Sequence, residues 1–345
     1  MDGIAASPDN LPNQEILAAN LTCFNKLEGR VNSGKSADIL CADVDGTLYK
    51  KVLTDEHWGK KGNNSAAFQE LEEKSIPHVL ISGRPDFDTA TDQEMSDLGV
   101  TPADVAIAGA GTIVYWRDDK EKLVLDQEFL SLMKSQKVIY GGKEEFLYNP
   151  EKLQPLLGQE IALFKQFGVK GLKIDTNQGA GFNTIDISNM SFDQLGKLVS
   201  HLRAKFSGIK VEFSEDLEKL DENHFSGWMQ IVPASGGKDK ALRFVLEKIA
   251  ARINPFNAET AKKPVAHIIG DAAIDILMLA MGAGEKDPYS VRQYALGNLT
   301  AYTRAKLERV KTSLSQHKNP DWRQAHLTIL EEQASIGVAK VVNSI

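Results

Sequence analysis

Short apolar runs that end abruptly in polar residues dominate the hydrophobic pattern of the chain. One run covers residues 38–43 and ends in Asp-Val-Asp-Gly-Thr, a second covers 78–82, and a third covers 104–108. Apolar residues at helical spacing, around 66–72, separate the first two runs. Strand, helix and strand in this order are typical of a βαβ unit, so we predict buried parallel strands at all three runs.

The pattern changes after about residue 120. Apolar and polar positions alternate over 181–187, and strand-like runs follow at 209–213 and 228–232. A helix is predicted between them, because apolar residues recur at helical spacing over 195–202. Alternation is typical of an antiparallel strand with one covered face. We therefore predict an α+β insert with an antiparallel sheet.

The α/β pattern returns after the insert. A helix is predicted from Lys238, and a buried strand over 264–269 ends in Gly270-Asp271. The last stretch, 285–345, is helical and polar in character. The predicted fold class is therefore α/β, with a parallel-sheet core and an inserted α+β domain. The predicted units are a peripheral N-terminal helix in 1–36, a core domain formed by 37–120 and 233–345, and the insert in 121–232.

Composition narrows the class of protein. The chain has 345 residues, of which 42% are hydrophobic and 25% charged, the balance of a soluble globular protein with room for two domains. Its formal net charge is −7, which gives no electrostatic reason to expect a nucleic-acid partner. No apolar run approaches the roughly 20 residues of a membrane span, so we expect no membrane partner.

The N-terminal sequence and the cysteine content indicate the cellular compartment. The N-terminus carries neither a basic region nor an apolar core, so no secretory signal is predicted. The two cysteines, Cys23 and Cys41, indicate a reduced chain rather than a disulfide framework. We expect a cytoplasmic protein. The sequence leaves its oligomeric state open.

Candidate chemistry gathers at the ends of the predicted strands. In open α/β sheets, ligands bind outside the carboxyl ends of the strands, so segments far apart in sequence are expected to converge there. The residues concerned are Asp43, Asp45, Ser82, Gly83, Arg84, Lys238, Asp271 and Asp275.

The four aspartates in this set predict a cation. Carboxylates confined together raise one another's pKa and cost free energy unless a cation intervenes. Oxygen ligands favour a hard ion, above all Mg²⁺. Ser82 and Lys238 supply donors that a phosphate would accept. A carboxylate cluster, a hard metal and a cationic donor together indicate phosphoryl transfer.

The spacing of Asp43 and Asp45 suits this chemistry. A carboxylate can attack phosphorus to give an acyl-phosphate. A second acid must then protonate the departing oxygen and later activate water. Residues two apart on an extended backbone point to the same side, and Gly46 lets the chain turn sharply just after them.

The candidate residues form four motifs, which are residues 43–47, residues 82–84, Lys238, and Gly270-Asp271 with Asp275. In this order, the four motifs resemble the haloacid dehalogenase (HAD) superfamily of phosphatases. Asp-Val-Asp-Gly-Thr-Leu, residues 43–48, is similar to the family's first motif at each defining position. The insert before Lys238 resembles a C2-type cap, as in subfamily IIB with its Cof-type and sucrose-phosphate phosphatases. The resemblance implies a Rossmann-like core with an inserted C2 cap domain.

The resemblance also implies roles for single residues. Asp43 matches the nucleophile and Asp45 the general acid and base. Ser82 matches the hydroxyl that binds the transferring phosphoryl group, and Lys238 the lysine that steadies its charge. A magnesium site is implied that is formed by Asp43, the Asp45 carbonyl, Asp271 and Asp275. Arg84, beside Gly83, either reaches the phosphate or forms a surface ion pair.

Two positions depart from the pattern of the resembled family. Ile274 stands where relatives with this cap usually carry Asn, and we expect the change to loosen the metal site or shift the substrate range. Asp239 stands where relatives often carry Gly, and an acid in the first turn of a helix suits the helix dipole.

The leading functional prediction is a phosphomonoester hydrolase whose partner is a small phosphorylated metabolite, with a sugar phosphate expected from the cap type. One alternative is a phosphomannomutase-like phosphotransferase that uses the same Asp43 chemistry. A catalytically retired scaffold is the other. Polar residues near 177–183 are candidates for substrate contact in the cap.

Overall fold

The computed structural model describes residues 38–48, 64–87, 89–177, 180–215, 223–253, 263–283, 287–297, 299, 301–315, 326–332 and 334–345. The predicted N-terminal helix in 1–36 lies outside these residues. Across the described ranges, no helix has the length and apolar character that a bilayer crossing requires.

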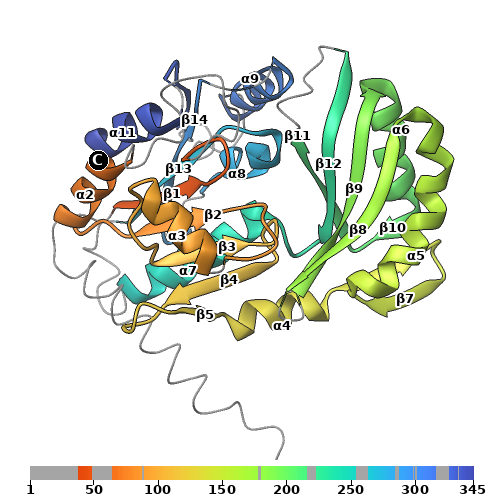
Figure 1. The fold of residues 1–345 in the computed structure, drawn as a ribbon, viewed down its shortest axis with the longest axis horizontal. Helices are drawn as coiled ribbons and strands as arrows, with labels where there is room; N and C mark the ends of the chain where they lie inside the picture. Colours follow the sequence, from red (N-terminus) through yellow and green to blue (C-terminus); the bar gives the residue numbers. More distant parts are fainter. Residues whose placement is uncertain are drawn as a thin grey trace, which may run out of the picture.

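A large twisted sheet forms the centre of the core (Figure 1). Eight strands among the described residues pair in the order β15-β14-β13-β1-β2-β3-β4-β5. The strands from β15 to β3 are parallel, and β4 and β5 are antiparallel additions. The bounds are β1 (Asp38–Asp43), β2 (His78–Ile81), β3 (Val105–Ala108), β4 (Ile113–Arg117), β5 (Leu123–Leu125), β13 (Val265–Gly270), β14 (Ser290–Ala295) and β15 (His326–Ile329).

Helices cover both faces of this sheet because its central strands are apolar on both sides. In β1, Ile39 and Cys41 face one hydrophobic cluster, while Leu40 and Ala42 face the other. The first cluster includes residues of α7 (Lys238–Ile253), α8 (Ile276–Leu279) and α9 (Ala301–Ser315). The second includes residues of α2 (Ser65–Glu73), α3 (Thr89–Asp97) and α11 (Ala334–Ser344).

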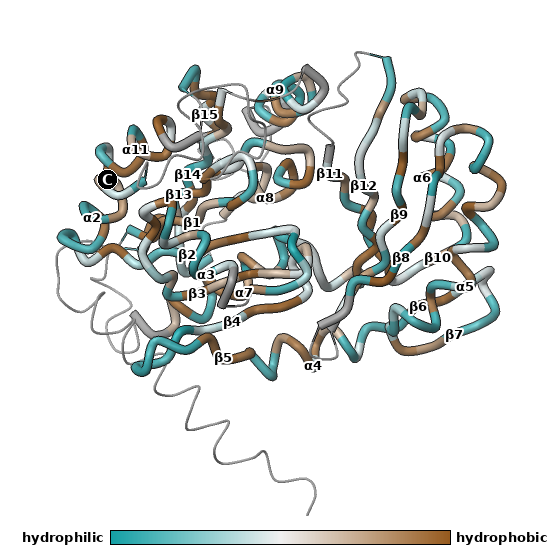
Figure 2. The backbone as a smooth tube through the Cα atoms, in the orientation of Figure 1, coloured by the Kyte–Doolittle hydropathy of each residue, from teal (hydrophilic) through white to brown (hydrophobic). Residues whose placement is uncertain are grey.

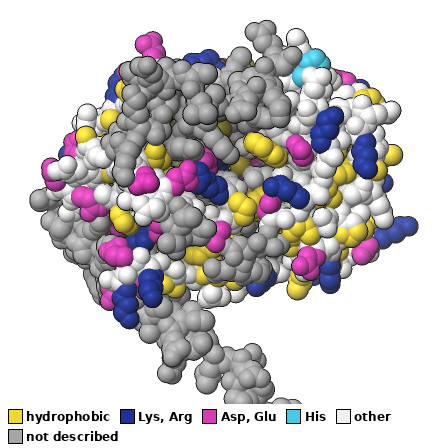
Figure 3. Space-filling model, viewed as in Figure 1, with side chains coloured by type: hydrophobic (Ala, Val, Ile, Leu, Met, Phe, Trp, Pro, Cys, Tyr) yellow, Lys and Arg dark blue, Asp and Glu magenta, His cyan; other side chains and the backbone are white. Residues whose placement is uncertain are grey.

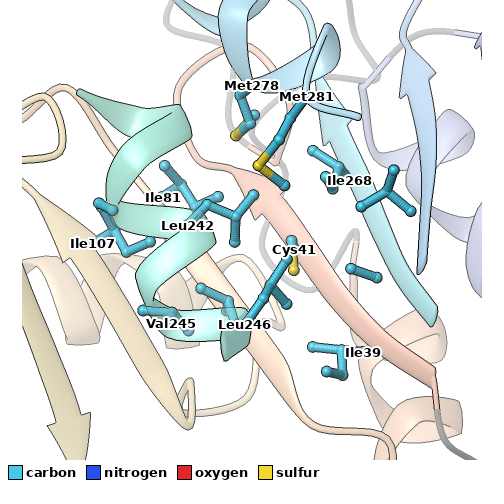
Figure 4. Packing of buried hydrophobic residues seen from close by; sticks show 14 of the residues in the cluster. Ile39, Cys41, Ile81, Ile107, Leu242, Val245, Leu246, Ile268, Met278 and Met281 are labelled. Carbon is cyan, nitrogen blue, oxygen red and sulfur yellow. The ribbon is translucent and has the colours of Figure 1, made fainter. Parts of the chain in front are cut away.

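Helix α7 packs directly over the middle of the sheet. Figure 4 shows Leu242, Val245 and Leu246 of α7 facing Cys41 and Ile81 of the neighbouring strands. Their spacing of three and four residues places them on one helix face. In Figure 2 the hydrophobic colour likewise runs through strands of this sheet such as β3 and β4. This packing fixes the start of α7, where Lys238 lies.

The insert folds as a second layer beside the core (Figure 1). Within the described residues, its main sheet has the antiparallel order β11-β12-β9-β8, and β10-β6-β7 form a smaller sheet. The bounds are β6 (Lys137–Tyr140), β7 (Glu144–Leu147), α5 (Pro150–Ile161), η2 (Ala162–Phe167), β8 (Val169–Asn177), β9 (Ala180–Ser191), α6 (Phe192–Lys205), β10 (Phe206–Ser207), β11 (Ile209–Glu215) and β12 (His224–Pro233). The predicted fold class, a Rossmann-like α/β core with an α+β cap, is confirmed.

The main cap sheet has one apolar and one largely polar face. Val211, Ile185 and Met229 lie in the hydrophobic core of the cap, which α5 and α6 complete on the side away from the core domain (Figure 1). Side chains alternate along a strand, so the intervening positions face the other way. Glu212 and Gln230 are such positions, and they lie opposite each other in the β11–β12 register.

The prediction for residues 285–345 was incomplete. The helices α9 and α11 are present, but β14 and β15 also lie there and extend the parallel sheet. β14 reads Ser-Val-Arg-Gln-Tyr-Ala, and its burial alternates because the strand lies near the sheet edge. A polar strand of this kind lacks the continuous apolar run that marks a central parallel strand.

The core continues past the predicted boundary at residue 120. Strand β5 belongs to the core sheet, and helix α4 (Gln127–Ser135) places Phe129 and Met133 in a core cluster. We therefore propose that the cap begins near residue 136 and ends near residue 233.

Replacing Leu246 by Ala is expected to destabilise the fold strongly. The side chain is fully buried between α7 and the sheet, so its loss leaves a cavity that costs about 2–5 kcal/mol of unfolding free energy. Urea unfolding monitored by circular dichroism measures this. Lys240→Ala is the matched control, since Lys240 is exposed on the same helix. Equal stability of the two variants would contradict the packing described.

Candidate active site

The carboxyl ends of three neighbouring strands meet at one edge of the core sheet. Asp43 ends β1, Ser82 follows β2, and Asp271 follows β13. The strand register brings Asp43 opposite Ile81. The convergence predicted from the separate motifs is therefore present in the geometry.

Lys238 links two of the buried carboxylates. Its Nζ donates to Asp43 Oδ1 at 2.5 Å and to Asp275 Oδ1 at 2.7 Å. All three side chains are almost fully buried. The other oxygen of Asp275, Oδ2, accepts the backbone N–H groups of Asp271 and Ala272, each at 3.1 Å. Asp275 thus ties the lysine to the loop that follows β13.

Burial and charge shift the pKa values of this group. Burial raises the pKa of Asp43 well above its ordinary value, and the neighbouring Asp275 raises it further, although Lys238 opposes both. Burial lowers the pKa of Lys238, but Asp275 and Asp43 outweigh burial and the net shift is upward. The lysine is therefore held as an ammonium ion beside the carboxylates.

Gly46 and Thr47 shape the position of Asp271. Thr47 Oγ1 donates to Asp271 Oδ1 at 2.9 Å. Gly46 has a φ of +94°, and a Cβ added there would overlap the Asp271 carboxylate. Glycine is therefore needed both for the turn and for the close approach of the two segments. This explains physically why Gly-Thr follows the two aspartates.

The donor set fits a hard divalent ion. Asp43, Asp271 and Asp275 each offer a carboxylate oxygen within 4.8 Å of the others, and all three residues are buried. These three carboxylates face one lysine, so the group carries excess negative charge that a cation would offset. Oxygen ligands at this spacing suit Mg²⁺. The predicted contribution of the Asp45 carbonyl stays a prediction.

The Asp45 carboxylate lies apart from that group and points toward Ser82 and Arg84. Ser82 Oγ donates to Asp45 Oδ2 at 3.2 Å and accepts the Arg84 backbone N–H at 3.0 Å. Arg84 Nη2 donates to Asp45 Oδ1 at 2.7 Å, and its Nη1 donates to Glu94 Oε2 at 2.5 Å. The Asp45 side chain is 47% exposed, so a substrate can reach it. Arg84 therefore forms an ion pair, as one of its two predicted roles required, and its partner is the candidate general acid Asp45.

The cap reaches the same loops. Gln230 Nε2 donates to the Gly83 carbonyl at 3.3 Å, and Lys210 forms an ion pair with Asp239. Ile274 packs in a small apolar cluster with Phe182 and Val232 of the cap. The two positions that depart from the resembled family pattern, Ile274 and Asp239, are thus both contacts with the cap.

Polar residues near 177–183 were predicted as candidates for substrate contact, and Asn183 is one of them that the structure describes. Asn183 is buried and its Nδ2 donates to the Pro150 carbonyl at 3.1 Å, which is a contact within the cap. Gln230, Lys210 and Glu212 were not predicted. The alternation of polar and apolar residues along β11 and β12 was the available signal, because it places these three on the face opposite the cap core.

Glu212 is a buried carboxyl group of the cap, close to the contact between Lys210 and Asp239 of the core. Its Oε1 lies 2.9 Å from Lys210 Nζ, and its side chain is 2% exposed. Burial raises its pKa from the ordinary 4.5 to about 7, although Lys210 opposes the shift. Glu212 therefore takes up or loses its proton near neutral pH.

Comparison with known proteins agrees with the resemblance seen in the motifs. The sequence model of the haloacid dehalogenase-like hydrolase family matches residues 40–283 of the chain. That span includes each of the four motifs. The sequence matches none of the curated proteins with which it was compared.

One solved structure shares the fold at low identity, and further solved structures match most of this chain with lower scores. The sucrose-phosphatase from Synechocystis sp. PCC6803, in complex with sucrose and phosphate, is 12% identical, with a TM-score of 0.54 over 90% of this chain and 98% of that chain. The haloacid dehalogenase-like hydrolase yhjK from Bacillus subtilis is 16% identical, with a TM-score of 0.48 over 90% and 92%. The C. albicans trehalose-6-phosphate phosphatase C-terminal domain is 13% identical, with a TM-score of 0.46 over 92% and 95%.

Asp271→Asn is expected to weaken Mg²⁺ binding. The change removes one negative ligand, and since even outer partners of metal ligands are worth roughly 10–100-fold in affinity, we expect a loss of at least about 10-fold. Isothermal titration calorimetry with Mg²⁺ measures this directly. Asp193→Asn is the control, because Asp193 is exposed on α6 and pairs with Lys197. Unchanged Mg²⁺ affinity in Asp271→Asn would rule out the proposed ligand set.

Glu212 is expected to make the fold less stable as pH rises. A carboxyl whose pKa is raised on folding binds its proton more tightly in the folded state, so stability falls between about pH 4.5 and 7. A shift of this size corresponds to roughly 3 kcal/mol. Urea unfolding from pH 5 to 8 measures it, with Glu212→Gln as reference. If the difference between wild type and Glu212→Gln does not change with pH, the expectation is wrong.

Proposed function

The chain belongs to the haloacid dehalogenase-like hydrolase family, and we propose that it is a Mg²⁺-dependent phosphomonoester hydrolase that forms an aspartyl-phosphate on Asp43. The observation that carries the proposal is the position of Asp43 at the tip of β1. There its carboxylate is held by Lys238 and lies within metal-sharing distance of Asp271 and Asp275.

The side chains divide the reaction between them. A carboxylate oxygen of Asp43 attacks phosphorus, the bond to the substrate oxygen breaks, and Asp45 protonates that departing oxygen. Asp45 then takes a proton from the water that hydrolyses the acyl-phosphate. Its exposure and its position beside Ser82 suit a group that must meet both substrate and water.

The remaining groups handle the phosphoryl charge. The Lys238 ammonium and the Ser82 hydroxyl are donors fixed at the edges of the site, where they stabilise charge that develops on the transferring group. A bound Mg²⁺ would supply further positive charge that shields the attacking carboxylate from the phosphate. Arg84, anchored by Glu94, would keep the Asp45 carboxylate oriented.

A small polyhydroxylated leaving group suits the cap surface that faces the site. Gln230 Oε1 is buried without a hydrogen-bond partner among the described residues, and a substrate hydroxyl could satisfy it. Trp228, two residues earlier on β12, is 40% exposed on the same face of the sheet. An aromatic ring beside polar groups is a surface on which a sugar can pack. We therefore propose a phosphorylated sugar as substrate.

The surroundings of the site carry both signs of charge. Figure 3 shows acidic and basic side chains interspersed on the face seen there, including the region where the core and the cap adjoin. Such a surface fits recognition by a few placed groups rather than by a broad field of one sign.

Phosphate release from a panel of phosphorylated metabolites, with Mg²⁺ present, tests the proposal. Wild type is expected to turn over at least one sugar phosphate, and Asp43→Asn is expected to lose nearly all activity, roughly 10⁴-fold or more, since the nucleophile is gone. Asp193→Asn serves as a surface control.

Two results would point elsewhere. Phosphate release that occurs only when an acceptor sugar is present would indicate a phosphotransferase. No turnover of any substrate, together with no Mg²⁺ binding, would favour the retired scaffold and overturn the proposal. Because the similar Synechocystis structure is a sucrose-phosphatase with sucrose and phosphate bound, a sucrose phosphate is one member of the panel.

A further inference from the structure

Three cap contacts each fall on a residue adjacent in sequence to a candidate residue of the active site. Gln230 contacts Gly83, which follows Ser82. Lys210 contacts Asp239, which follows Lys238. Phe182 and Val232 pack against Ile274, which precedes Asp275. The cap therefore touches the backbone segments that carry the catalytic groups rather than only a remote hinge.

The Lys210 contact is the one among these three that consists of buried ion pairs. Lys210 Nζ pairs with Asp239 of the core and, at 2.9 Å, with Glu212 of the cap. The Lys210 and Asp239 side chains are mostly buried, and Glu212 is almost wholly so. A Cβ added at Gly237 would overlap Lys210 Nζ and Glu212 Oε1, so these groups lie against the backbone just before Lys238.

This ion cluster depends on Lys210. Lys210 is the cation that lies between the acidic side chains Asp239 of the core and Glu212 of the cap, so without it no ion pair joins the cap to Asp239. A buried carboxyl that loses its cation takes up a proton, so Glu212 cannot replace the lost partner of Asp239. The loss of the ion pair would act on the first turn of α7, which begins at Lys238 and carries Asp239.

We propose that Lys210 of the cap is a positioning residue for the reaction: through Asp239 it sets the start of α7, and thereby aligns Lys238 with Asp43. Lys210 acts through another residue and does not itself meet the phosphoryl group. This inference rests on the proposed phosphatase function. It adds that docking of the cap and alignment of the catalytic lysine are one event.

The test compares Lys210→Met, Asp239→Asn and the double variant with wild type, on p-nitrophenyl phosphate with Mg²⁺. This small substrate leaves the cap surface largely unused. A misplaced catalytic group costs roughly 10–100-fold, so we expect kcat to fall by about that factor while KM changes by less than about 3-fold. Lys210→Arg is expected to keep most of the activity, because it keeps the charge.

The double variant isolates the contact itself. If both residues act through one ion pair, the double variant is expected to lose no more kcat than the worse single variant. Lys197→Met is the control, since Lys197 pairs with Asp193 on the exposed side of α6 and should leave kcat unchanged. Multiplying losses in the double variant would overturn the proposal. So would a Lys210→Met effect confined to KM.

Hydrogen exchange gives a readout that does not require activity. Peptides covering residues 236–246 are expected to exchange faster in Lys210→Met and in Asp239→Asn than in wild type, and Lys210→Arg is expected to match wild type. Unchanged exchange there in Asp239→Asn would overturn the proposal even if Lys210→Met fails to fold. A wild type without phosphatase activity would refute the proposed function, whereas the exchange result would still report on the contact.

Discussion

The buried ion cluster of Asp43, Lys238 and Asp275 is the interaction on which the rest of the site depends. Removing charges from water costs free energy that only close partners offset. Here one ammonium group bridges two carboxylates, at 2.5 and 2.7 Å, and Asp275 also receives two backbone N–H groups. The strand tips of β1 and β13 and the start of α7 are thereby held in one arrangement, with excess negative charge suited to a divalent cation.

The cap contacts lie next to members of this buried ion cluster. The pKa values of Asp43 and Lys238 are raised under the combined effect of burial and neighbouring charges, so they depend on the distances between these side chains. The cap contacts the residues next to Lys238 and Asp275. The apolar contact at Ile274 and the ion pair at Asp239 stand at the two positions where the chain departs from the resembled family. Both departures are therefore contacts with the cap of this chain.

Much of the fold could be predicted because the buried strands of a parallel core are recognisable from their own residues. The strands β1, β2, β3 and β13 are apolar on both faces, since helices cover both faces of the sheet. Each therefore appears in the sequence as a continuous apolar run. β14 and β15 escaped prediction because they lie next to and at the edge of the sheet, where strands carry polar residues. Glu94 escaped because its partner Arg84 meets it only through the packing of α3 beside β2.

By itself, the sequence determined the candidate groups: aspartates and a serine at the ends of apolar strands, which parallel pairing must bring to one edge, and a lysine at the start of a helix. Tertiary structure alone decided how those groups are held. Lys210 and Asp239 are 29 positions apart, and Gln230 and Gly83 are 147 apart. Such pairs form only when the cap and the core pack against each other, and no local spacing or propensity encodes the result.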